Sequence, residues 1–330
     1  MDQSSLLSDL FLAYFEARKN KRSSLGEIAF EMNFEREIFR LYDEIISRTY
    51  KISPSTCFIS QFPIRREIFA GAFRDRVVHH FVFKHLNPLC ERFFINDSYS
   101  CRLGRGTSYG IARAEHFARS VSENYLREAY VLKLDISGYF MSMDKHILFE
   151  KIQTILDRFQ YELTMERDLL MWLIETIIFN DPTNACIIKG KRNDWVGLPK
   201  SKSLFFSRKD CGLPIGNLTS QLFSNIYLHD LDTYVMYTLG IKHYGRYVDD
   251  MILFSQEKNI LQNMPTVINT YLHTKLHIRL HPKKIYLQPV RHGFLFLGKV
   301  ILPYHRYLKR KTKANAYKKI VFWKKASLTE

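Results

Sequence analysis

Two adjacent carboxylates lie between two apolar runs in the last third of the sequence. Asp249 and Asp250 follow Tyr244–Val248 and precede Met251–Phe254. Two apolar runs separated by a short polar segment are typical of a β-hairpin, with the two Asp at its tight turn. Adjacent carboxylates repel each other unless a cation lies between them, and oxygen ligands favour Mg²⁺ or Mn²⁺. The alternative is an ordinary Asp-containing turn without a metal.

A third carboxylate ends another apolar segment. Tyr130–Leu134 reads as a strand, and Asp135 follows it directly. Taken alone, this Asp could cap the helix that begins after it. If the two strands are neighbours in one sheet, however, all three acids converge. A two-metal phosphoryl-transfer site needs such a group, because one metal activates the attacking hydroxyl and the other holds the triphosphate and the leaving oxygen.

A glycine-rich loop lies between these two elements. Gly212–Gln221 contains two Gly and one Pro and leads into the apolar stretch Leu222–Leu231. Asn217, Thr219 and Ser220 supply capping or ligand-facing groups at a helix start. A glycine-rich loop before a helix is generic. The order of strand with Asp, loop with helix, and hairpin with two Asp is specific.

In this order the blocks resemble the motifs of reverse transcriptases, over nearly the whole chain. The palm motifs A to E match Lys133–Phe140, Gly212–Gln221, Arg246–Asp250, Leu276–Lys284 and His292–Gly298. The fingers blocks match Arg65–Ile68, Phe73–Val78 and Asp97–Gly106. The resemblance implies an α+β right-hand polymerase with fingers, palm and a short thumb. Its palm would be an antiparallel sheet that carries the catalytic Asp residues.

The resemblance also divides the chain into three regions. Residues 1–128 would form N-terminal helices and fingers, and residues 129–298 the palm with part of the fingers. Residues 299–330 would form the basic start of a thumb, which is short for a complete one. Hydrophobic spacing predicts a mostly helical segment over 1–60 and helices at 76–94, 145–159 and 166–179. The polar and basic segment 189–210 is expected to be a loop or hairpin insertion.

The resemblance assigns catalytic and nucleotide-binding roles. Asp135, Asp249 and Asp250 would be catalytic and would bind two Mg²⁺ ions, or Mn²⁺, with the backbone carbonyl of Ile136 as a further ligand. Phe140 would be the steric gate against a 2′-hydroxyl, and its alternative is a core aromatic. The remaining residues expected to bind dNTP are Arg65, Arg66, Ile215, Gln221 and Lys284.

Among these, the Arg pair would neutralise the triphosphate, which suits the bidentate geometry of guanidinium. A surface charge pair is the alternative for Arg65 and Arg66. Lys284 would protonate the leaving pyrophosphate, and the adjacent Lys283 competes for that role. The residues expected to contact primer and template are Tyr247, Gly293, Phe294, Leu297, Gly298, Lys309, Arg310 and Lys311.

Motif B departs from the pattern of most reverse transcriptases, which carry Gln-Gly and end the motif in Ser-Pro. Here it reads Ile215-Gly216 and ends in Ser220-Gln221. This string, with Leu198–Phe205 before it, resembles the enzymes of diversity-generating retroelements. Those enzymes copy a template-repeat RNA into cDNA with errors concentrated at adenines, and the cDNA replaces a variable repeat. Because Ile215 cannot hydrogen-bond near the nascent base pair, low fidelity is expected.

Two other functions remain open. Some prokaryotic reverse transcriptases of antiphage defence, and retron-like enzymes, share parts of the motif B pattern. A catalytically inactive RNA-binding protein with a polymerase hand is the second alternative, although it would not need three acids. For the active nucleotidyltransferase, the expected partners are template RNA, primer or cDNA, dNTPs and a small basic accessory protein.

The charge balance agrees with a nucleic-acid partner. Lys and Arg number 49 against 33 Asp and Glu, a formal net charge of +16. Phosphate contacts dominate the affinity of such proteins and make it salt-dependent, although basic charge also serves solubility or membrane-surface contact. Tyr307–Lys325 interleaves cations with aromatic residues. It would be the start of a thumb that grips the template–primer backbone, or else a solvated basic helix.

Cysteine usage and hydropathy favour a reducing compartment. The five Cys contain no C-x-x-C pair, which opposes a zinc site or a disulfide framework. The first residues lack a basic leader region, and no apolar run is long enough to span a membrane. A cytoplasmic protein without membrane contact is therefore expected, and the resemblance in motif B implies that a prokaryote or phage encodes it.

Overall fold

The structure is a computed structural model that describes residues 3–19, 25–61 and 64–326. Its contacts divide the chain into two compact units. Unit 1 comprises Met1–Phe94, Ser137–His229 and His273–Ile278. Unit 2 comprises Ile95–Ile136, Asp230–Leu272 and Arg279–Glu330. Each unit is thus built from three separate stretches of sequence, so contacts between distant segments hold it together.

A four-stranded antiparallel sheet organises unit 2, with the strand order β5-β6-β3-β7. Its strands are β3 (Tyr130–Leu134), β5 (His243–Tyr247), β6 (Asp250–Ser255) and β7 (Tyr286–Pro289). The four residues from Met251 to Phe254 in β6 are all buried, as expected for a central strand covered on both faces. The predicted strand before Asp135 and the predicted hairpin around Asp249 are both confirmed.

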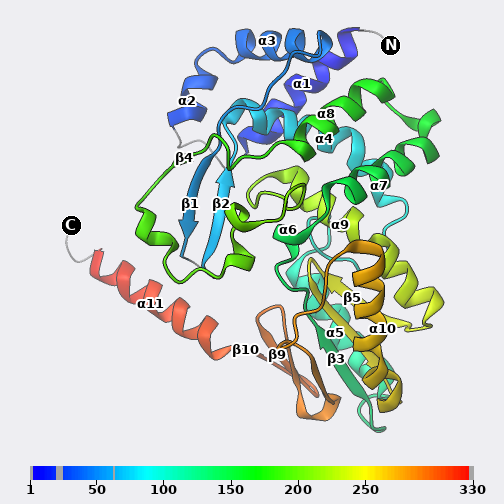
Figure 1. The fold of residues 1–330 in the computed structure, drawn as a ribbon. Helices are drawn as coiled ribbons and strands as arrows, with labels where there is room; N and C mark the ends of the chain where they lie inside the picture. Colours follow the sequence, from blue (N-terminus) through cyan, green and yellow to red (C-terminus); the bar gives the residue numbers. More distant parts are fainter. Residues whose placement is uncertain (1–2, 20–24, 62–63, 327–330) are drawn as a thin grey trace. The chain divides into compact units, whose positions relative to one another are not determined.

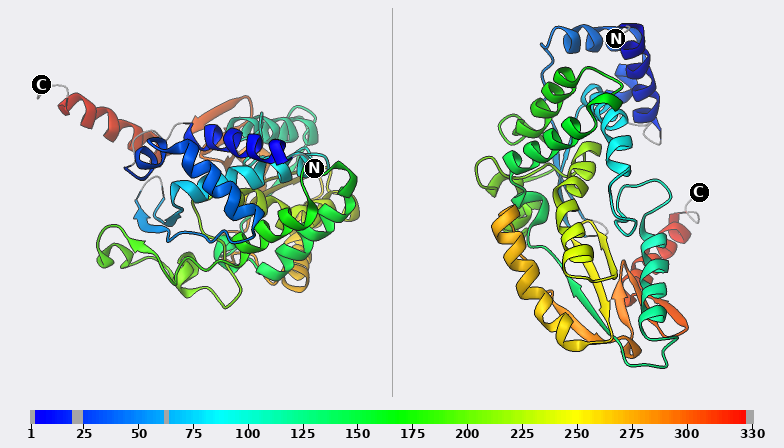
Figure 2. Two further views of the ribbon diagram at one scale, coloured as in Figure 1. Left: turned by 90° about the horizontal axis from the view of Figure 1, so that it is seen from above. Right: turned by 90° about the vertical axis from the view of Figure 1, so that its right-hand side faces the viewer.

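Helices α5 (Thr107–Val121) and α10 (Lys258–Leu276) lie on opposite faces of this sheet (Figures 1 and 2). On the α5 face, Ile111 and Phe117 pack against Val131, Ile252 and Phe254 in one buried cluster. Such burial stabilises a fold by roughly 25 cal/mol per Å² of apolar surface. The antiparallel sheet of unit 2 therefore has its own hydrophobic core.

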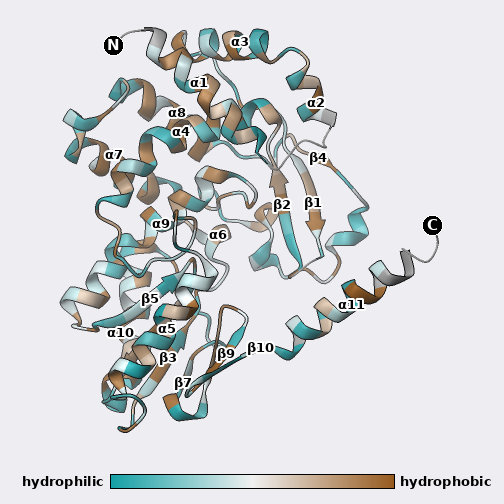
Figure 3. Ribbon diagram, turned by 180° about the vertical axis from the view of Figure 1, so that it is seen from behind, coloured by the Kyte–Doolittle hydropathy of each residue, from teal (hydrophilic) through white to brown (hydrophobic). Residues whose placement is uncertain are grey.

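A second antiparallel sheet of unit 2 follows, in the order β10-β9-β8. Its strands are β8 (Phe294–Phe296), β9 (Lys299–Leu302) and β10 (His305–Leu308), preceded by the turn η6 (Val290–His292). Leu297 and Gly298 form the β8–β9 turn with φ of +46° and +84°. Positive φ at both central residues is the requirement of a type I′ hairpin turn. Helix α11 (Arg310–Ala326) comes next and carries both hydrophilic and hydrophobic residues (Figure 3).

Unit 1 combines helices with a small three-stranded sheet. Its helices are α1 (Gln3–Arg18), α2 (Leu25–Glu31), α3 (Phe34–Ile46), α4 (Phe73–Glu91), α6 (Tyr139–Ser142), α7 (Lys145–Arg158) and α8 (Arg167–Phe179). Strand β1 (Thr56–Ser60) pairs antiparallel with β2 (Arg66–Ala70) and parallel with β4 (Ile187–Ile188). The predicted helices at 76–94, 145–159 and 166–179 are confirmed as α4, α7 and α8.

The remaining helical segments include several short turns. Helix α9 (Leu218–Thr233) continues into the π-helical turn η5 (Tyr234–Thr238). Short 3₁₀ turns occur at η1 (Gln160–Glu162), η2 (Arg192–Trp195), η3 (Lys200–Lys202) and η4 (Leu204–Phe206). Segment 189–210 is therefore a loop with three such turns, and the hairpin alternative for it is wrong.

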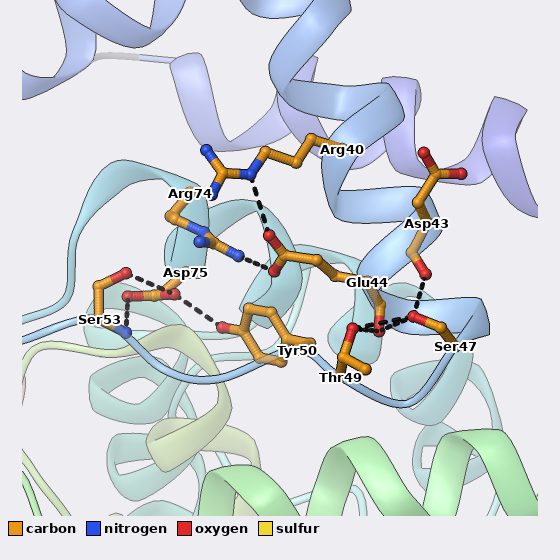
Figure 4. A network of polar contacts seen from close by, with 9 residues as sticks. All are labelled: Arg40, Asp43, Glu44, Ser47, Thr49, Tyr50, Ser53, Arg74 and Asp75. Carbon is orange, nitrogen blue, oxygen red and sulfur yellow. Dashed lines mark hydrogen bonds and ion pairs between the residues drawn. The ribbon is translucent and has the colours of Figure 1, made fainter.

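A network of polar contacts ties the end of α3 to the start of α4 (Figure 4). Glu44 accepts a hydrogen bond from Arg74. The fully buried Asp75 accepts from the Tyr50 hydroxyl at 2.8 Å and from the Ser53 N–H at 3.0 Å. Burial raises the pKa of Asp75, and the bonds from Tyr50 and Ser53 oppose that rise. These contacts satisfy a buried carboxylate that would otherwise be costly.

Within residues 3–19, 25–61 and 64–326, no helix is both long enough and apolar enough to cross a bilayer.

Candidate active site

The β5–β6 hairpin places Asp249 at the tip of a two-residue turn. Tyr247 pairs with Asp250 across the hairpin, which leaves Val248 and Asp249 as the central residues. Val248 has a φ of +55°, a conformation that β-branched residues rarely adopt. Positive φ at the first central position is the pattern of a type II′ turn, which normally carries Gly there. The acidic tip is therefore held in a strained backbone conformation.

The register of the sheet places Asp135 next to this hairpin. Leu134 of β3 pairs with Met251 of β6, so the next step along both strands sets Asp135 opposite Asp250. Residues directly opposite on antiparallel strands have Cβ atoms about 4.5–5.5 Å apart. Asp135 is only 8% exposed. The structure thus brings all three predicted acids to one end of the sheet in unit 2.

Their proximity affects the pKa values of Asp249 and Asp250. Burial raises the pKa of Asp249 to about 7, and the negative charges of Asp135 and Asp250 add to the rise. Burial also raises the pKa of Asp250, although the nearby Lys133 ammonium acts against it. Clustered carboxylates that are shielded from water bind protons more tightly because their charges repel. The cluster therefore has a strong electrostatic demand for positive charge.

Two lysines meet part of this demand. Lys284 donates to Asp135 Oδ2 at 2.7 Å. Partial burial alone would lower the pKa of Lys284, but this bond and the nearby carboxylates raise it. Lys133 lies two residues before Asp135 and so points to the same face of β3. Burial lowers the pKa of Lys133, while Asp250 and Asp135 oppose that change. The sequence did not identify Lys133 as a site residue, although its position in an apolar strand was a signal.

One oxygen of this cluster remains available for a ligand. Asp135 Oδ1 is buried and has no hydrogen-bond partner among the described residues. As the side chains stand, however, the described residues contain no group of three His, Cys, Asp or Glu that could hold a metal ion. The Lys284 ammonium occupies the other oxygen of Asp135. Three carboxylates with an unpartnered buried oxygen fit a hard divalent cation, provided that Lys284 releases Asp135.

A buried ion pair supports the β5–β6 hairpin. Arg246 of β5 is fully buried and donates to both oxygens of Asp232, with Nε to Oδ1 at 2.7 Å and Nη2 to Oδ2 at 2.6 Å. The Tyr244 hydroxyl donates to Asp232 Oδ1 at 2.6 Å. Arg246 Nη1 also donates to the carbonyl of Val248 at 2.9 Å. Sequence reasoning missed Asp232, whose signal was an acid near the end of a largely apolar helix.

The segment around Tyr99 runs along the outer edge of β5. Arg246 donates its N–H to the carbonyl of Asp97 at 2.8 Å and accepts from the Tyr99 N–H at 2.9 Å. The Tyr99 ring covers Gly245, where an added Cβ would lie 2.8 Å from Tyr99 Cζ. Arg113 binds both oxygens of Asp97, at 2.6 and 3.0 Å. A side chain at position 245 would therefore displace this edge segment.

The residues predicted to bind the nucleotide lie mainly in unit 1. Phe140 and Ile215 pack against one apolar cluster that contains Phe69. The Phe69 N–H donates to the carbonyl of Ile215 at 2.9 Å, and the Leu213 N–H donates to that of Phe140 at 2.8 Å. Gly216 has a φ of +132°, and a Cβ there would lie 2.8 Å from the Phe69 carbonyl oxygen. Motif B therefore packs against β2 so closely that only Gly fits.

The two predicted arginines differ in their surroundings. Arg66 is exposed at the start of β2, whereas Arg65 is partly buried and donates to the carbonyl of Asp194. Glu67, the next residue of β2, is fully buried and accepts three hydrogen bonds. The donors are Trp195 Nε1 at 2.7 Å, Ser203 Oγ at 2.7 Å and the Leu204 N–H at 2.6 Å. The insertion is thus fastened to β2 in a way that sequence reasoning missed.

The other predicted site residues are distributed over both units. Gln221 is exposed on α9 in unit 1, and Ile136 is buried next to Asp135 in unit 2. Tyr247 and Leu297 pack at the margin of the α5 cluster, and Phe294 is buried inside it. Gly293 has a φ of +73°. Lys309 and Arg310 are exposed at the start of α11, and the side chain of Lys311 lies outside the described residues.

The raised pKa of Asp249 predicts a pH-dependent penalty in metal-free protein. The folded protein holds this proton up to a pH of about 7, against 3.8 for the free side chain. Stability from this group is therefore lost as pH rises between these values. We therefore compare the free energy of unfolding of Asp249→Asn with that of the parent. From pH 5 to pH 8, this difference should shift in favour of the variant by about 1–3 kcal/mol. Urea unfolding with EDTA at both pH values measures the difference.

Asp43→Asn is the matched control, because Asp43 is exposed at the end of α3. Its stability difference from the parent should hardly change with pH. If Asp249→Asn and Asp43→Asn showed the same pH dependence, the acid cluster would not be under electrostatic repulsion.

Comparisons with known proteins agree with this geometry. The family model described as reverse transcriptase (RNA-dependent DNA polymerase) matches residues 65–301, which is more than half of the chain. A search of curated proteins found no match. Among solved structures, an apo telomerase from Candida tropicalis, truncated from its C-terminal domain, has a TM-score of 0.54 at 14% identity over 81% of this chain.

A telomerase from Candida albicans, in complex with the TWJ fragment of telomeric RNA, has a TM-score of 0.49 at 12% identity over 80% of this chain. The chain spans 59% and 50% of these two telomerase chains. The first similarity concerns the fold, and with the antiparallel sheet of unit 2 it confirms the predicted α+β right-hand polymerase. Because the family model matches most of the sequence, the chain belongs to the reverse transcriptase family.

Proposed function

We propose that this chain is an RNA-directed DNA polymerase that uses the acid cluster of unit 2 for two-metal phosphoryl transfer. The observation that carries the proposal is the register of the sheet. It sets Asp135 opposite Asp250, beside the Asp249 turn. Family membership supports the same activity. A protein that only bound RNA would gain nothing from three repelling carboxylates at one end of a sheet.

Asp135, Asp249, Asp250 and the Ile136 carbonyl would hold two Mg²⁺ ions, or Mn²⁺. When bound, these ions lower the pKa of the attacking hydroxyl and neutralise charge on the triphosphate. The chain's own contribution is to fix the carboxylates on strand ends, where the sheet limits their movement. Lys284 would leave Asp135 as the ions bind, and its ammonium would then be free to donate a proton to the leaving pyrophosphate.

The nucleotide would be selected by residues of unit 1. Phe140 is proposed as the steric gate, because an aromatic ring packed on an apolar cluster resists displacement by a 2′-hydroxyl. The exposed Arg66 is the stronger candidate for the triphosphate, since the guanidinium of Arg65 already binds the Asp194 carbonyl. Gln221 would contact the nucleotide from α9. Lys283 is a weaker candidate than Lys284, which already bonds to Asp135.

Primer and template would contact the β8–β9 hairpin and the start of α11. Gly293, Leu297 and Gly298 have positive φ in or next to this hairpin, and Phe294 is buried in the α5 cluster. Tyr247 would contact the primer end beside Asp250. The exposed Lys309 and Arg310, with Lys311, would neutralise backbone phosphates, which makes affinity fall steeply with salt.

Within the family we propose the diversity-generating type, in which adenine-directed errors enter the cDNA. The support is Ile215 in motif B, whose side chain packs against apolar neighbours and offers no hydrogen bond. A template RNA, a small basic accessory protein and a prokaryotic or phage origin belong to that proposal. A defence-associated or retron-like enzyme would share the acid cluster and would differ in the RNA that it copies.

Primer extension tests the activity. We expect the parent to extend a DNA primer on an RNA template with dNTPs and Mg²⁺. Asp249→Asn should lower the rate on the order of a thousandfold, because a carboxylate that would hold the metal ions is lost. Asp43→Asn, which changes an exposed acid far from the cluster in sequence, should match the parent. Equal extension by the parent and Asp249→Asn would reject the metal-site assignment.

The identity of residue 215 predicts the error spectrum. Ile215→Gln restores an amide that can hydrogen-bond near the nascent base pair, so errors at template adenines should fall roughly tenfold. Ile215→Leu keeps an apolar side chain of equal size and serves as the control. Sequencing of cDNA made on one RNA template measures both. An unchanged adenine error frequency in Ile215→Gln would remove Ile215 as the cause of low fidelity.

A further inference from the structure

The backbone conformation of Val248 needs support from outside the turn. Its φ of +55° is unfavourable for a branched side chain, which in this region crowds its own backbone. A two-residue turn of this kind would normally relax or carry Gly at the same position. Asp249 follows Val248 directly, so any relaxation of the turn moves the carboxylate at its tip.

Two hydrogen bonds hold the backbone of Val248, one at its N–H and one at its carbonyl oxygen. Its N–H donates to Ser100 Oγ, with an N···O distance of 3.3 Å. Its carbonyl accepts from Arg246 Nη1 at 2.9 Å. The N–H and the C=O on either side of the strained Cα are therefore both fixed. Neither donor nor acceptor belongs to the turn itself.

Both supports are themselves anchored inside unit 2. Ser100 is 1% exposed and lies in the edge segment that bonds to the backbone of Arg246 through Asp97 and Tyr99. Arg246 is held by both oxygens of the buried Asp232. A hydroxyl or guanidinium with so little freedom can oppose a backbone rotation, whereas a mobile surface group could not.

We propose that Ser100 is a positioning residue for polymerisation, resting on the proposed function of the acid cluster. Together with Arg246 it keeps Val248 at its positive φ and so fixes the position of the Asp249 carboxylate near Asp135 and Asp250. Ser100 does not touch the reacting atoms. Its proposed contribution passes through the backbone amide of Val248, and this contact matters because the residue that carries the amide is Val rather than Gly.

Four proteins test the proposal: the parent, Ser100→Ala, Val248→Gly and the double variant. Gly adopts positive φ without strain, so a Gly turn needs the Ser100 bond less. We expect Ser100→Ala to lower the kcat of primer extension about tenfold in the Val248 background. In the Val248→Gly background the same change should lower it less than about threefold. The KM for dNTP should change little in either background, because Ser100 acts on the carboxylate geometry.

Ser108→Ala is the matched control, since Ser108 is exposed in the first turn of α5. Hydrogen exchange over residues 247–250, measured without metal or substrate, gives a readout that needs no activity. Exchange should be about tenfold faster in Ser100→Ala than in the parent or Ser108→Ala. Equal loss of kcat in both backgrounds, or unchanged exchange in Ser100→Ala, would overturn the proposal. An inactive parent with faster exchange in Ser100→Ala would instead reject the proposed function and leave the backbone support standing.

Discussion

Repulsion among three carboxylates at one end of a sheet is the constraint on which the structure of unit 2 depends. Burial and the charges of Asp135 and Asp250 raise the pKa of Asp249 to about 7. A fold tolerates such a cluster only when positive charge compensates it. In the described structure, Lys284 and Lys133 provide part of that charge. Divalent cations would provide it in the proposed reaction, which links the electrostatic demand directly to function.

The surrounding elements hold these charges close together. The antiparallel register fixes Asp135 against Asp250, and a buried Arg246–Asp232 pair supports the hairpin that carries Asp249. Breaking one partner of such a pair typically destabilises a protein by about 3–5 kcal/mol, because a buried charge is left alone. The segment around Tyr99 lies along the edge strand β5, and the lack of a side chain at Gly245 leaves space for the Tyr99 ring. Much of the polar structure of unit 2 therefore maintains an unfavourable arrangement of acids.

Local patterns predicted the elements that carry the acids. The alternation of apolar runs with Asp identified β3 and the β5–β6 hairpin, and the Gly-rich block identified the start of α9. Sequence patterns did not reveal Glu67 or Ser100. Each acts through hydrogen bonds to residues more than a hundred positions away, and no local periodicity encodes such contacts. Segment 189–210 has no apolar alternation, and its contacts with Glu67 through Trp195, Ser203 and Leu204 are equally distant in sequence.

Diffraction from crystals grown with Mn²⁺ and a non-hydrolysable dNTP analogue tests the central claim most directly, because Mn²⁺ scatters anomalously. The account predicts two anomalous peaks, both in contact with carboxylate oxygens of Asp135 and Asp249, with the Lys284 ammonium moved away from Asp135. Crystals of Asp249→Asn should lose at least one peak. Absence of anomalous density at the three acids in the parent, with Lys284 still bonded to Asp135, would contradict it.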